Sequence, residues 1–237
     1  MRNINLRKKI PDVQMPSIEN YKIEPLNERI VSLRGAGFLV ESQYYQHQIK
    51  GSYYDCYVRE SLVDMLHKAE CLLPKGLRLK IYDGYRPICI QQYLWDFYRK
   101  DVLHKNPGCT EDEIDFKTSF FVSKPSYDVL RPSLHDTGGA IDVTLSTDSG
   151  YELNMGTIFD DFTDMAWTNH FEHYTDVAEV RKNRRILYNV MTAVGFTNLP
   201  SEWWHYDYGD KFWSYFTGKP AKYKGIIDID FPHRLCM

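Results

Sequence analysis

The sequence predicts an α+β fold with a small, mainly antiparallel sheet flanked by helices. The chain has 237 residues, of which 43% are hydrophobic and 26% charged, as in an ordinary globular protein. Helical and strand-like segments both occur, and they do not alternate regularly, which argues against a doubly wound parallel sheet. No repeat or flexible linker divides the chain, so we expect one domain over residues 1–237, with an irregular lead over about residues 1–25.

The first predicted helix and strand follow one another in the chain. The helix has its apolar residues at helical spacing: Val58, Leu62, Met65, Leu66 and Ala69. In the strand, Leu77, Leu79 and Ile81 alternate with polar residues, and the Asp83–Gly84 pair ends it as a turn. Both elements are therefore expected to turn an apolar face toward a common core.

A second helix is predicted directly after this turn. Pro87 can occupy its first turn, where a missing amide hydrogen costs nothing. Its expected apolar face contains four residues: Ile90, Leu94, Phe97 and Val102. The Asn106–Gly108 segment, which includes a proline, should end it. Residues 111–130 indicate neither a helix nor a strand clearly.

Three further elements complete the expected fold. Residues 140–145 alternate as a strand, with an apolar face formed by Ile141, Val143 and Leu145. A tight turn should return residues 151–155 as its antiparallel partner. A helix is predicted over residues 181–196, ending at a glycine that suits a C′ position, and residues 202–209 are predicted to form a late strand.

One feature of the middle strand points to chemistry. Asp142 lies on the face opposite Ile141 and Val143, where an ionised acid is costly unless it is paired or binds a metal. Two glycines before the strand permit a sharp turn that brings His135 back toward Asp142. His205, among large aromatic residues, could supply a third ligand. Two imidazoles and a carboxylate suit zinc, and three protein ligands with an open fourth position are typical of a catalytic site.

Glu202, three residues before His205, is the candidate general base for such a site. In an ideal strand these two residues point to opposite faces, so we predict a bend between them or a strand that begins after Glu202. Spacing alone leaves other interpretations open. His135 could be a loop residue, Asp142 could pair with an arginine, and the aromatic segment around His205 could be core.

Composition and charge argue against several classes of protein. A net charge of −3, with histidine neutral, is unlike that of a general nucleic-acid binder. No run of 18 apolar residues predicts a membrane span, and the basic first residues lead into no apolar signal segment. Five scattered cysteines favour reduced thiols and hence a cytoplasmic protein. His170 and His173 have helical spacing but no third ligand, so we expect them to face solvent.

Four motifs, in order along the chain, resemble those of a known family. SLHDTGGAID, residues 133–142, resembles the Ser-x-His-x-x-Gly-x-Ala-x-Asp signature of the VanX-type D-alanyl-D-alanine dipeptidases. These belong to a wider family of zinc D,D-peptidases that includes carboxypeptidases and relatives of the hedgehog signalling domain. YDGYRP (82–87), NMGTIFDDF (154–162) and EWWHY (202–206) resemble further motifs of the family, although Asn154 stands where an acidic residue is expected.

The resemblance implies a D,D-peptidase or hedgehog-like fold with a zinc site on the sheet. His135, Asp142 and His205 would bind one Zn²⁺ per chain. Glu202 would be the catalytic base and then the acid that protonates the leaving amine. Arg86 would stabilise the oxyanion, which suits a side chain that cannot lose its charge.

Three further residues are expected to bind a small dipeptide substrate. Asp160 would receive the free ammonium group, with neighbouring Asp161 as the alternative. Ser133 and Tyr127 would contact the ends of the dipeptide. Recognition of both termini would exclude longer peptides, and residues 150–175 could form one wall of the pocket or a solvated loop.

The resemblance thus implies hydrolysis of the D-alanyl-D-alanine dipeptide by a zinc-activated water. Two alternatives stay open: a zinc D,D-carboxypeptidase that trims longer cell-wall precursors, and a zinc-binding interaction module without catalysis. Glu202 and Arg86 argue against the module, which would need neither. The sequence decides neither the oligomeric state nor the physiological role, whether glycopeptide resistance, cell-wall turnover or use of the dipeptide as a nutrient.

Overall fold

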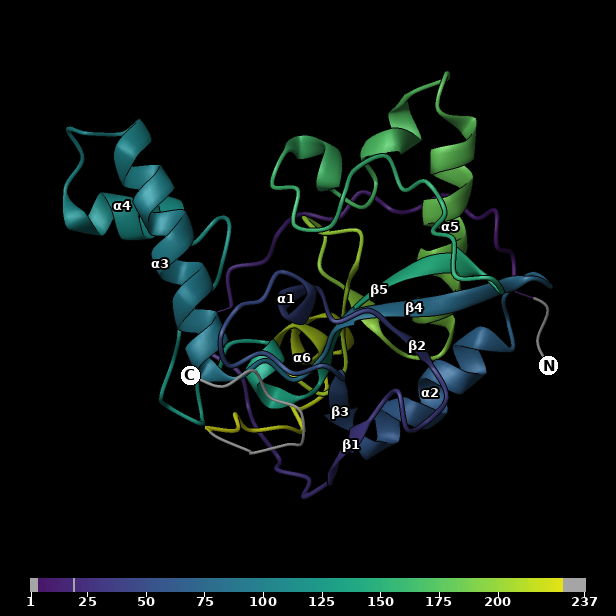
Figure 1. Cartoon of the computed structure of the whole chain (residues 1–237), viewed down its shortest axis with the longest axis horizontal. Coiled ribbons are helices and arrows are strands. Elements are labelled where there is room, and N and C mark those ends of the chain that lie inside the picture. The colour runs from purple at the N-terminus through teal and green to yellow at the C-terminus, as the bar shows by residue number, and fades with distance from the viewer. Residues whose placement is uncertain (1–3, 19, 228–237) are drawn as a thin grey trace.

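A five-stranded sheet forms the centre of the molecule in the computed structural model, which describes residues 4–18 and 20–227 (Figure 1). The strand order is β2-β4-β5-β7-β6. Their bounds are Leu39–Val40 (β2), Leu77–Asp83 (β4), Ala140–Thr147 (β5), Thr197–Asn198 (β6) and His205–Asp207 (β7). The β2–β4 pair is parallel and the others are antiparallel, so the predicted α+β class with a mainly antiparallel sheet is confirmed.

Two helices pack against the apolar face of the long strands. These are α2 (Glu60–Glu70) and α5 (Ala178–Ala193), and both contribute buried residues to the same core as Ile141, Val143 and Leu145. Because side chains alternate along a strand, Asp142 is left on the other face of β5. Gly195 follows α5 with a φ of 107°, a left-handed value that suits glycine and agrees with the predicted C′ position.

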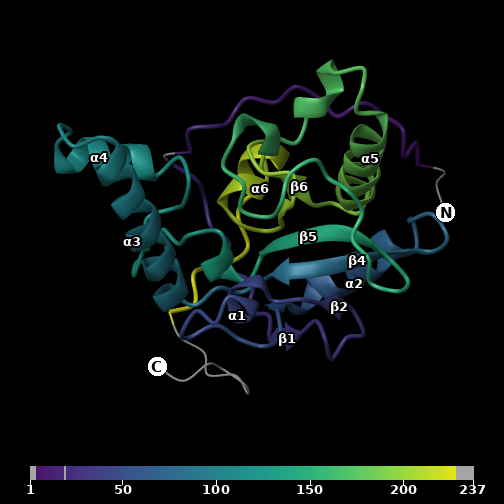
Figure 2. The same cartoon turned by 45° about the horizontal axis from the view of Figure 1, so that its top comes forward.

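Helices α3 (Ile88–Lys105) and α4 (Glu111–Thr118) form an arm that projects from the body in both views (Figures 1 and 2). Pro87 is the N-cap of α3 and does not lie in its first turn. Helix α4 lies within residues 111–130, whose pattern indicates neither a helix nor a strand clearly. Thr110 and Glu113 form a reciprocal capping box at its start, and this Thr-x-x-Glu spacing is a signal that could have revealed the helix.

Two predictions about apolar residues are wrong. Val58 does not begin a helix, because it lies in β3 (Tyr57–Arg59), which pairs with β1 (Ile30–Ser32) in a second, two-stranded sheet. Phe97 is 57% exposed, because α3 extends into the arm and leaves the body of the protein. Helical spacing identified the helix in both cases. It could not show that the helix begins after Val58, or that the part of α3 with Phe97 has no core to pack against.

The expected strand over residues 151–155 is reduced to a single bridge between Ser146 and Glu152. Residues 4–18 and 20–25 are irregular, apart from a bridge between Ile23 and Ala221. Five short helical elements complete the fold: α1 (Gln43–Gln46), α6 (Lys211–Thr217) and the 3-10 turns η1 (His135–Thr137), η2 (Asp164–Ala166) and η3 (His170–His173). Among the described helices, none combines the length and apolar character that a membrane span needs.

Candidate metal centre and active site

Three side chains that are far apart in the sequence meet on the polar face of the sheet. His135 lies in η1, and Gly138, with a φ of 69°, then turns the chain into β5. Asp142 follows on β5, directly opposite His205 in the antiparallel ladder with β7. The glycine turn and the strand register together bring His135, Asp142 and His205 to one place, as the sequence predicts.

The distances within this group suit a metal ion. His135 Nε2 lies 3.1 Å from His205 Nδ1 and 3.3 Å from Asp142 Oδ2. His205 Nδ1 lies 3.1 Å from Asp142 Oδ1. The three side chains are buried, and their ligand atoms lie within 4.8 Å of one another. Two imidazole nitrogens and one carboxylate oxygen, preorganised at such spacing, fit a zinc ion.

A second layer of contacts orients both imidazole rings. His135 Nδ1 lies 2.8 Å from the carbonyl oxygen of Gly84, which only accepts, so Nδ1 carries the hydrogen and Nε2 faces the centre. His205 Nε2 lies 2.7 Å from Asp207 Oδ1, and its Nδ1 faces the centre. Such outer partners fix the tautomer and the ring orientation of metal-binding histidines. Sequence reasoning missed Asp207, although residues two apart in a strand share a face.

The opposite charges of Asp142 and His205 stabilise each other. Burial disfavours ionisation of Asp142, but His135 and His205 outweigh it and hold the pKa of Asp142 below its usual range. Burial also disfavours the charged form of His205, but Asp207 and Asp142 raise its pKa well above the ordinary value. A metal ion would therefore compete with a proton at this site.

Glu202 lies beside the three ligands but is not one of them. Its Oε2 is 3.9 Å from His205 Nδ1. Strand β7 begins only at His205, and the Glu202 amide donates to the Leu199 carbonyl in the turn before it. The predicted irregularity between Glu202 and His205 is thus confirmed. Burial raises the pKa of Glu202 above the ordinary value of a glutamate, which suits a general base.

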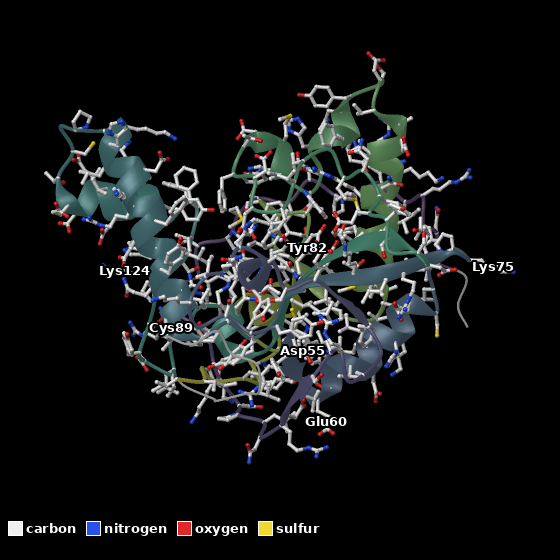
Figure 3. All side chains as sticks on the ribbon, in the orientation of Figure 1. Asp55, Glu60, Lys75, Tyr82, Cys89 and Lys124 are labelled. Atoms are coloured by element: carbon white, nitrogen blue, oxygen red, sulfur yellow. The ribbon has the colours of Figure 1, made fainter. Side chains whose placement is uncertain are left out.

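Arg86 reaches the same place from the end of β4. This part of the chain runs from the periphery near Lys75 to the centre of the molecule at Tyr82 (Figure 3). The Arg86 Nε donates to Asp83 Oδ2 at 2.8 Å, and its Nη2 lies 3.5 Å from Asp142 Oδ2. Burial opposes the charge of Arg86, but Tyr44 and the carboxylates around it keep its pKa above the usual value. Sequence reasoning missed Asp83, which fixes the guanidinium.

Asp160 brings another carboxyl group to the site. It has a φ of 56°, a left-handed conformation that is uncommon in residues other than glycine, although aspartate tolerates it, and such conformations cluster at functional sites. Tyr44 Oη donates to its Oδ2 at 3.2 Å. Burial raises the pKa of Asp160 to about 8. Asp161 instead accepts the amide hydrogen of Thr163 within its own loop.

A cavity connects these groups. It is lined by the three candidate ligands together with Arg86, Asp160, Glu202 and the buried Ser133. Its apolar wall includes Leu94, Tyr98, Phe121, Phe162 and Leu199. Tyr127 is 68% exposed and lies outside the cavity lining, because the loop after α4 carries it along the outer surface. The structure therefore unites every predicted site residue except Tyr127.

A buried set of two histidines and an aspartate, with a carboxylate and an arginine beside it, is typical of a catalytic metal centre. The family model described as D-ala-D-ala dipeptidase matches residues 33–222, and the chain belongs to this family. The resemblance of the four motifs is thereby confirmed. A curated D-alanyl-D-alanine dipeptidase from Synechocystis is 25% identical over 150 residues, which cover 57% of this chain and 61% of that protein.

A second curated D-alanyl-D-alanine dipeptidase, from Escherichia coli, is 32% identical over 155 residues, which cover 64% of this chain and 66% of the relative. The matched part of the chain thus spans slightly less than two thirds of the length of each of these two curated relatives. A solved VanY D,D-pentapeptidase with Zn(II), from a VanB-type resistance cassette, aligns with a TM-score of 0.40 and 18% identity, over 73% of this chain and 85% of that chain. VanYB in complex with D-alanine-D-alanine aligns with the same TM-score and identity, over 70% of this chain and 81% of that chain.

Proposed function

We propose that the protein hydrolyses the dipeptide D-alanyl-D-alanine with one Zn²⁺ held by His135, Asp142 and His205. The observation that carries the proposal is the convergence of these three buried side chains beside Glu202, in a cavity that also contains Arg86. Membership in the D-ala-D-ala dipeptidase family and the curated relatives of that name support the choice of substrate.

Glu202 is the general base and acid of the proposed reaction. A zinc ion in a three-ligand site supplies Lewis acidity that polarises a carbonyl group and makes water more acidic. The Glu202 carboxylate takes a proton from the attacking water and returns it to the leaving amine. Its raised pKa favours this exchange, because a base works best when its pKa lies near the working pH.

Arg86 stabilises the negative charge that develops on the carbonyl oxygen of the scissile bond. Asp83 holds its Nε and Gln91 holds its Nη1, so the guanidinium is oriented before the substrate arrives. A preorganised donor of this kind acts on the transition state more than on the ground state, and its loss costs on the order of 3 kcal/mol in other enzymes.

Asp160 and Ser133 recognise the two ends of the dipeptide. A substrate ammonium supplies the positive charge that the buried Asp160 carboxylate needs, and Ser133 supplies a hydroxyl group for the carboxylate end. Aromatic and aliphatic side chains line the space between them and suit two methyl groups. Tyr127 has no part in this assignment, and Tyr44, which contacts Asp160, takes its place in the pocket.

Metal analysis coupled to a dipeptide assay tests the proposal. The wild-type protein should retain about one zinc per chain and hydrolyse D-Ala-D-Ala faster than L-Ala-L-Ala. Glu202→Gln should keep the zinc and lose on the order of 100- to 10,000-fold in kcat, the usual contribution of general acid–base catalysis. Glu179→Ala, at an exposed position on α5, is the matched control. Preference for the L-isomer would contradict the proposal, and faster cleavage of a pentapeptide would indicate a carboxypeptidase.

A further inference from the structure

The chain between β6 and β7 bends so that Glu202 and His205 both face the cavity. In an ideal strand these two residues point to opposite sides. Here β7 begins only at His205, and the Glu202 amide donates to the Leu199 carbonyl at 3.0 Å. The His205 amide donates to the Glu202 carbonyl at 3.3 Å, slightly longer than most hydrogen bonds of this kind. The direct backbone contact between the two residues is thus a weak one.

Asn198, the last residue of β6, bridges the two ends of this bend with its side chain. Its Nδ2 donates to the Glu202 carbonyl at 3.0 Å and to the His205 carbonyl at 2.9 Å. Because a carbonyl oxygen only accepts, the nitrogen of the side-chain amide must face both groups. A primary amide has two hydrogens and can give one to each carbonyl. The residue type at this position therefore matches its two acceptors.

The sheet holds both Asn198 and His205 without the help of this contact. Asn198 pairs with Tyr206 in the ladder between β6 and β7. His205 pairs with Asp142 in the ladder between β7 and β5. The Asn198 side chain thus connects the backbone of Glu202, which precedes β7, to strands that are fixed independently.

The Glu202 carboxyl group depends on this backbone for its position. Its Oε2 lies 3.9 Å from His205 Nδ1, beyond hydrogen-bond distance, and its side chain lines the cavity with 23% of its surface exposed. A general base must come within about 2.6–3.2 Å of the atom whose proton it takes. A misplacement of about 1 Å can therefore cost on the order of 100-fold in rate.

We propose that Asn198 is a positioning residue, whose side-chain amide holds the backbone of Glu202 at a fixed place relative to His205. Asn198 is not among the described residues that line the cavity, so it acts through Glu202 and not on the substrate. The inference rests on the proposed function, in which Glu202 is the general base. The bend itself belongs to the chain and can be measured without metal or substrate.

Two substitutions remove the donors of Asn198 in different ways. Asn198→Ala removes the amide group, and Asn198→Asp keeps its shape but offers only acceptors to the two carbonyl groups. In both variants kcat for D-Ala-D-Ala should fall about 10- to 100-fold. KM should change little, because the groups assigned to the substrate ends lie on other segments, and about one zinc per chain should remain. An unchanged kcat in either variant, or loss of the zinc, would contradict the proposal.

Thr197→Val is the matched control in the same strand. It removes the hydroxyl group that donates to the Asp207 carbonyl at 3.4 Å and keeps a β-branched side chain in β6. Its kcat should equal that of wild type. A loss as large as that of Asn198→Ala would mean that any change in β6 disturbs the site, and the specific role of Asn198 would be refuted.

A double-mutant cycle with Glu202→Gln separates positioning from a general loss of structure. If Asn198 acts through Glu202, Asn198→Ala should lower kcat much less in the Glu202→Gln protein than in wild type, because the group that it positions no longer acts as a base. Equal losses in the two proteins would show that Asn198 acts on something other than Glu202, and the proposal would fail.

Amide hydrogen exchange in the metal-free proteins tests the bridge without any activity. The His205 amide should exchange faster in Asn198→Ala than in wild type or Thr197→Val, because the bend opens more easily, while the amides of β4 should not change. Equal exchange of His205 in all three proteins, or faster exchange throughout β4, would overturn the inference. If wild type binds no zinc or cleaves no dipeptide, the proposed function fails, whereas this measurement still judges the role of Asn198.

Discussion

Asp160 shows how one residue can oppose the stability of the fold that contains it. Its backbone is in the left-handed region and its carboxyl group is buried near Asp142 and Glu202, both of which raise its pKa further. Such strain and unfavourable charge are common where a site is prepared for a ligand. An arriving ammonium group would relieve the electrostatic cost, so binding and stability should respond in opposite directions when this residue is changed.

Asp160→Asn should weaken binding of the dipeptide. The substitution keeps the shape and the left-handed tendency of the side chain but removes the negative charge. We expect KM for D-Ala-D-Ala to rise about 10- to 100-fold, because a hydrogen bond to a charged group contributes about 1.5–3 kcal/mol. Asp161→Asn, beside it in the same loop, should leave KM unchanged. Equal effects of the two substitutions would mean that Asp160 does not bind the substrate.

The same substitution should stabilise the metal-free protein at high pH. The pKa of Asp160 is about 8 in the folded chain, against a reference value of 3.8. Between these pH values the folded state binds more protons than the unfolded state, so the contribution of Asp160 to stability falls as pH rises through this window. Asparagine does not titrate. The Tm of Asp160→Asn minus that of wild type should therefore increase from about pH 4 to about pH 8, and a constant difference would contradict the raised pKa.

Residues whose roles depend on nearby sequence could be predicted, and those that depend on tertiary contacts could not. His135, Asp142 and Glu202 stand in short motifs that resemble those of the family, and this resemblance indicates their chemistry. Tyr44 acts through Asp160, which the fold brings to it from a distant segment. Asp83 acts through Arg86, only three residues further along the chain, and was missed although both lie in the same motif. Tyr127 was expected in the pocket on resemblance alone, without a motif to place it, and it lies on the surface.

At the scale of elements, Arg184 of α5 holds the long segment that carries Asp160. Its guanidinium donates to the carbonyl oxygens of Met155, Met165 and Trp167, and its side chain is only 2% exposed. One buried side chain thus ties both ends of an otherwise irregular segment to a helix. Asp160 and Phe162 of this segment line the cavity, so the segment forms part of its wall, one of the two possibilities that the sequence leaves open.

Arg184→Met should loosen this segment. We expect a loss on the order of 3 kcal/mol in the free energy of unfolding, because buried carbonyl groups are left without donors at about 1–3 kcal/mol each. KM for the dipeptide should rise as well, since Asp160 would no longer be held. Denaturant unfolding and steady-state kinetics measure the two effects. Lys182→Met, at an exposed position on the same helix, should change neither.

The long elements could be predicted from periodicity, but the short strands could not. Strands β4 and β5 have enough alternating residues to indicate their faces, and α5 has a clear apolar stripe. Strands β2 and β6 contain two residues each, too few for any period, and they exist because they pair with β4 and β7. Their positions follow from the sheet as a whole.

The cavity is assembled from segments that span most of the chain. It joins the arm to the body through an aromatic cluster, in which the Tyr98 ring lies 4.7 Å from the Phe162 ring and 6.3 Å from the Phe121 ring. A site of this kind depends on the packing of the entire molecule. The metal should in turn stabilise that packing, because its candidate ligands come from η1, β5 and β7.

Removal of zinc should therefore lower the stability of the whole protein. At a free zinc concentration of about 1,000 times the dissociation constant, binding adds about 4 kcal/mol, which corresponds to roughly 8–16 °C in Tm for a chain of this size. Thermal unfolding with and without a chelator measures the difference. His135→Ala should lose most of this difference in Tm, while Thr110→Ala should keep it. A wild-type Tm that does not change with the chelator would mean that no metal is bound.

The pairing of Asp142 with His205 across two strands also makes the metal sensitive to errors in folding. A slip of β7 by a single residue along β5 would send His205 to the opposite face and bring Tyr206 in its place. A chain misaligned in this way cannot assemble the ligand set, so it gains nothing from the ion. Metal binding should thus favour molecules with the correct β5–β7 register during refolding, and the bound metal should identify those molecules afterwards.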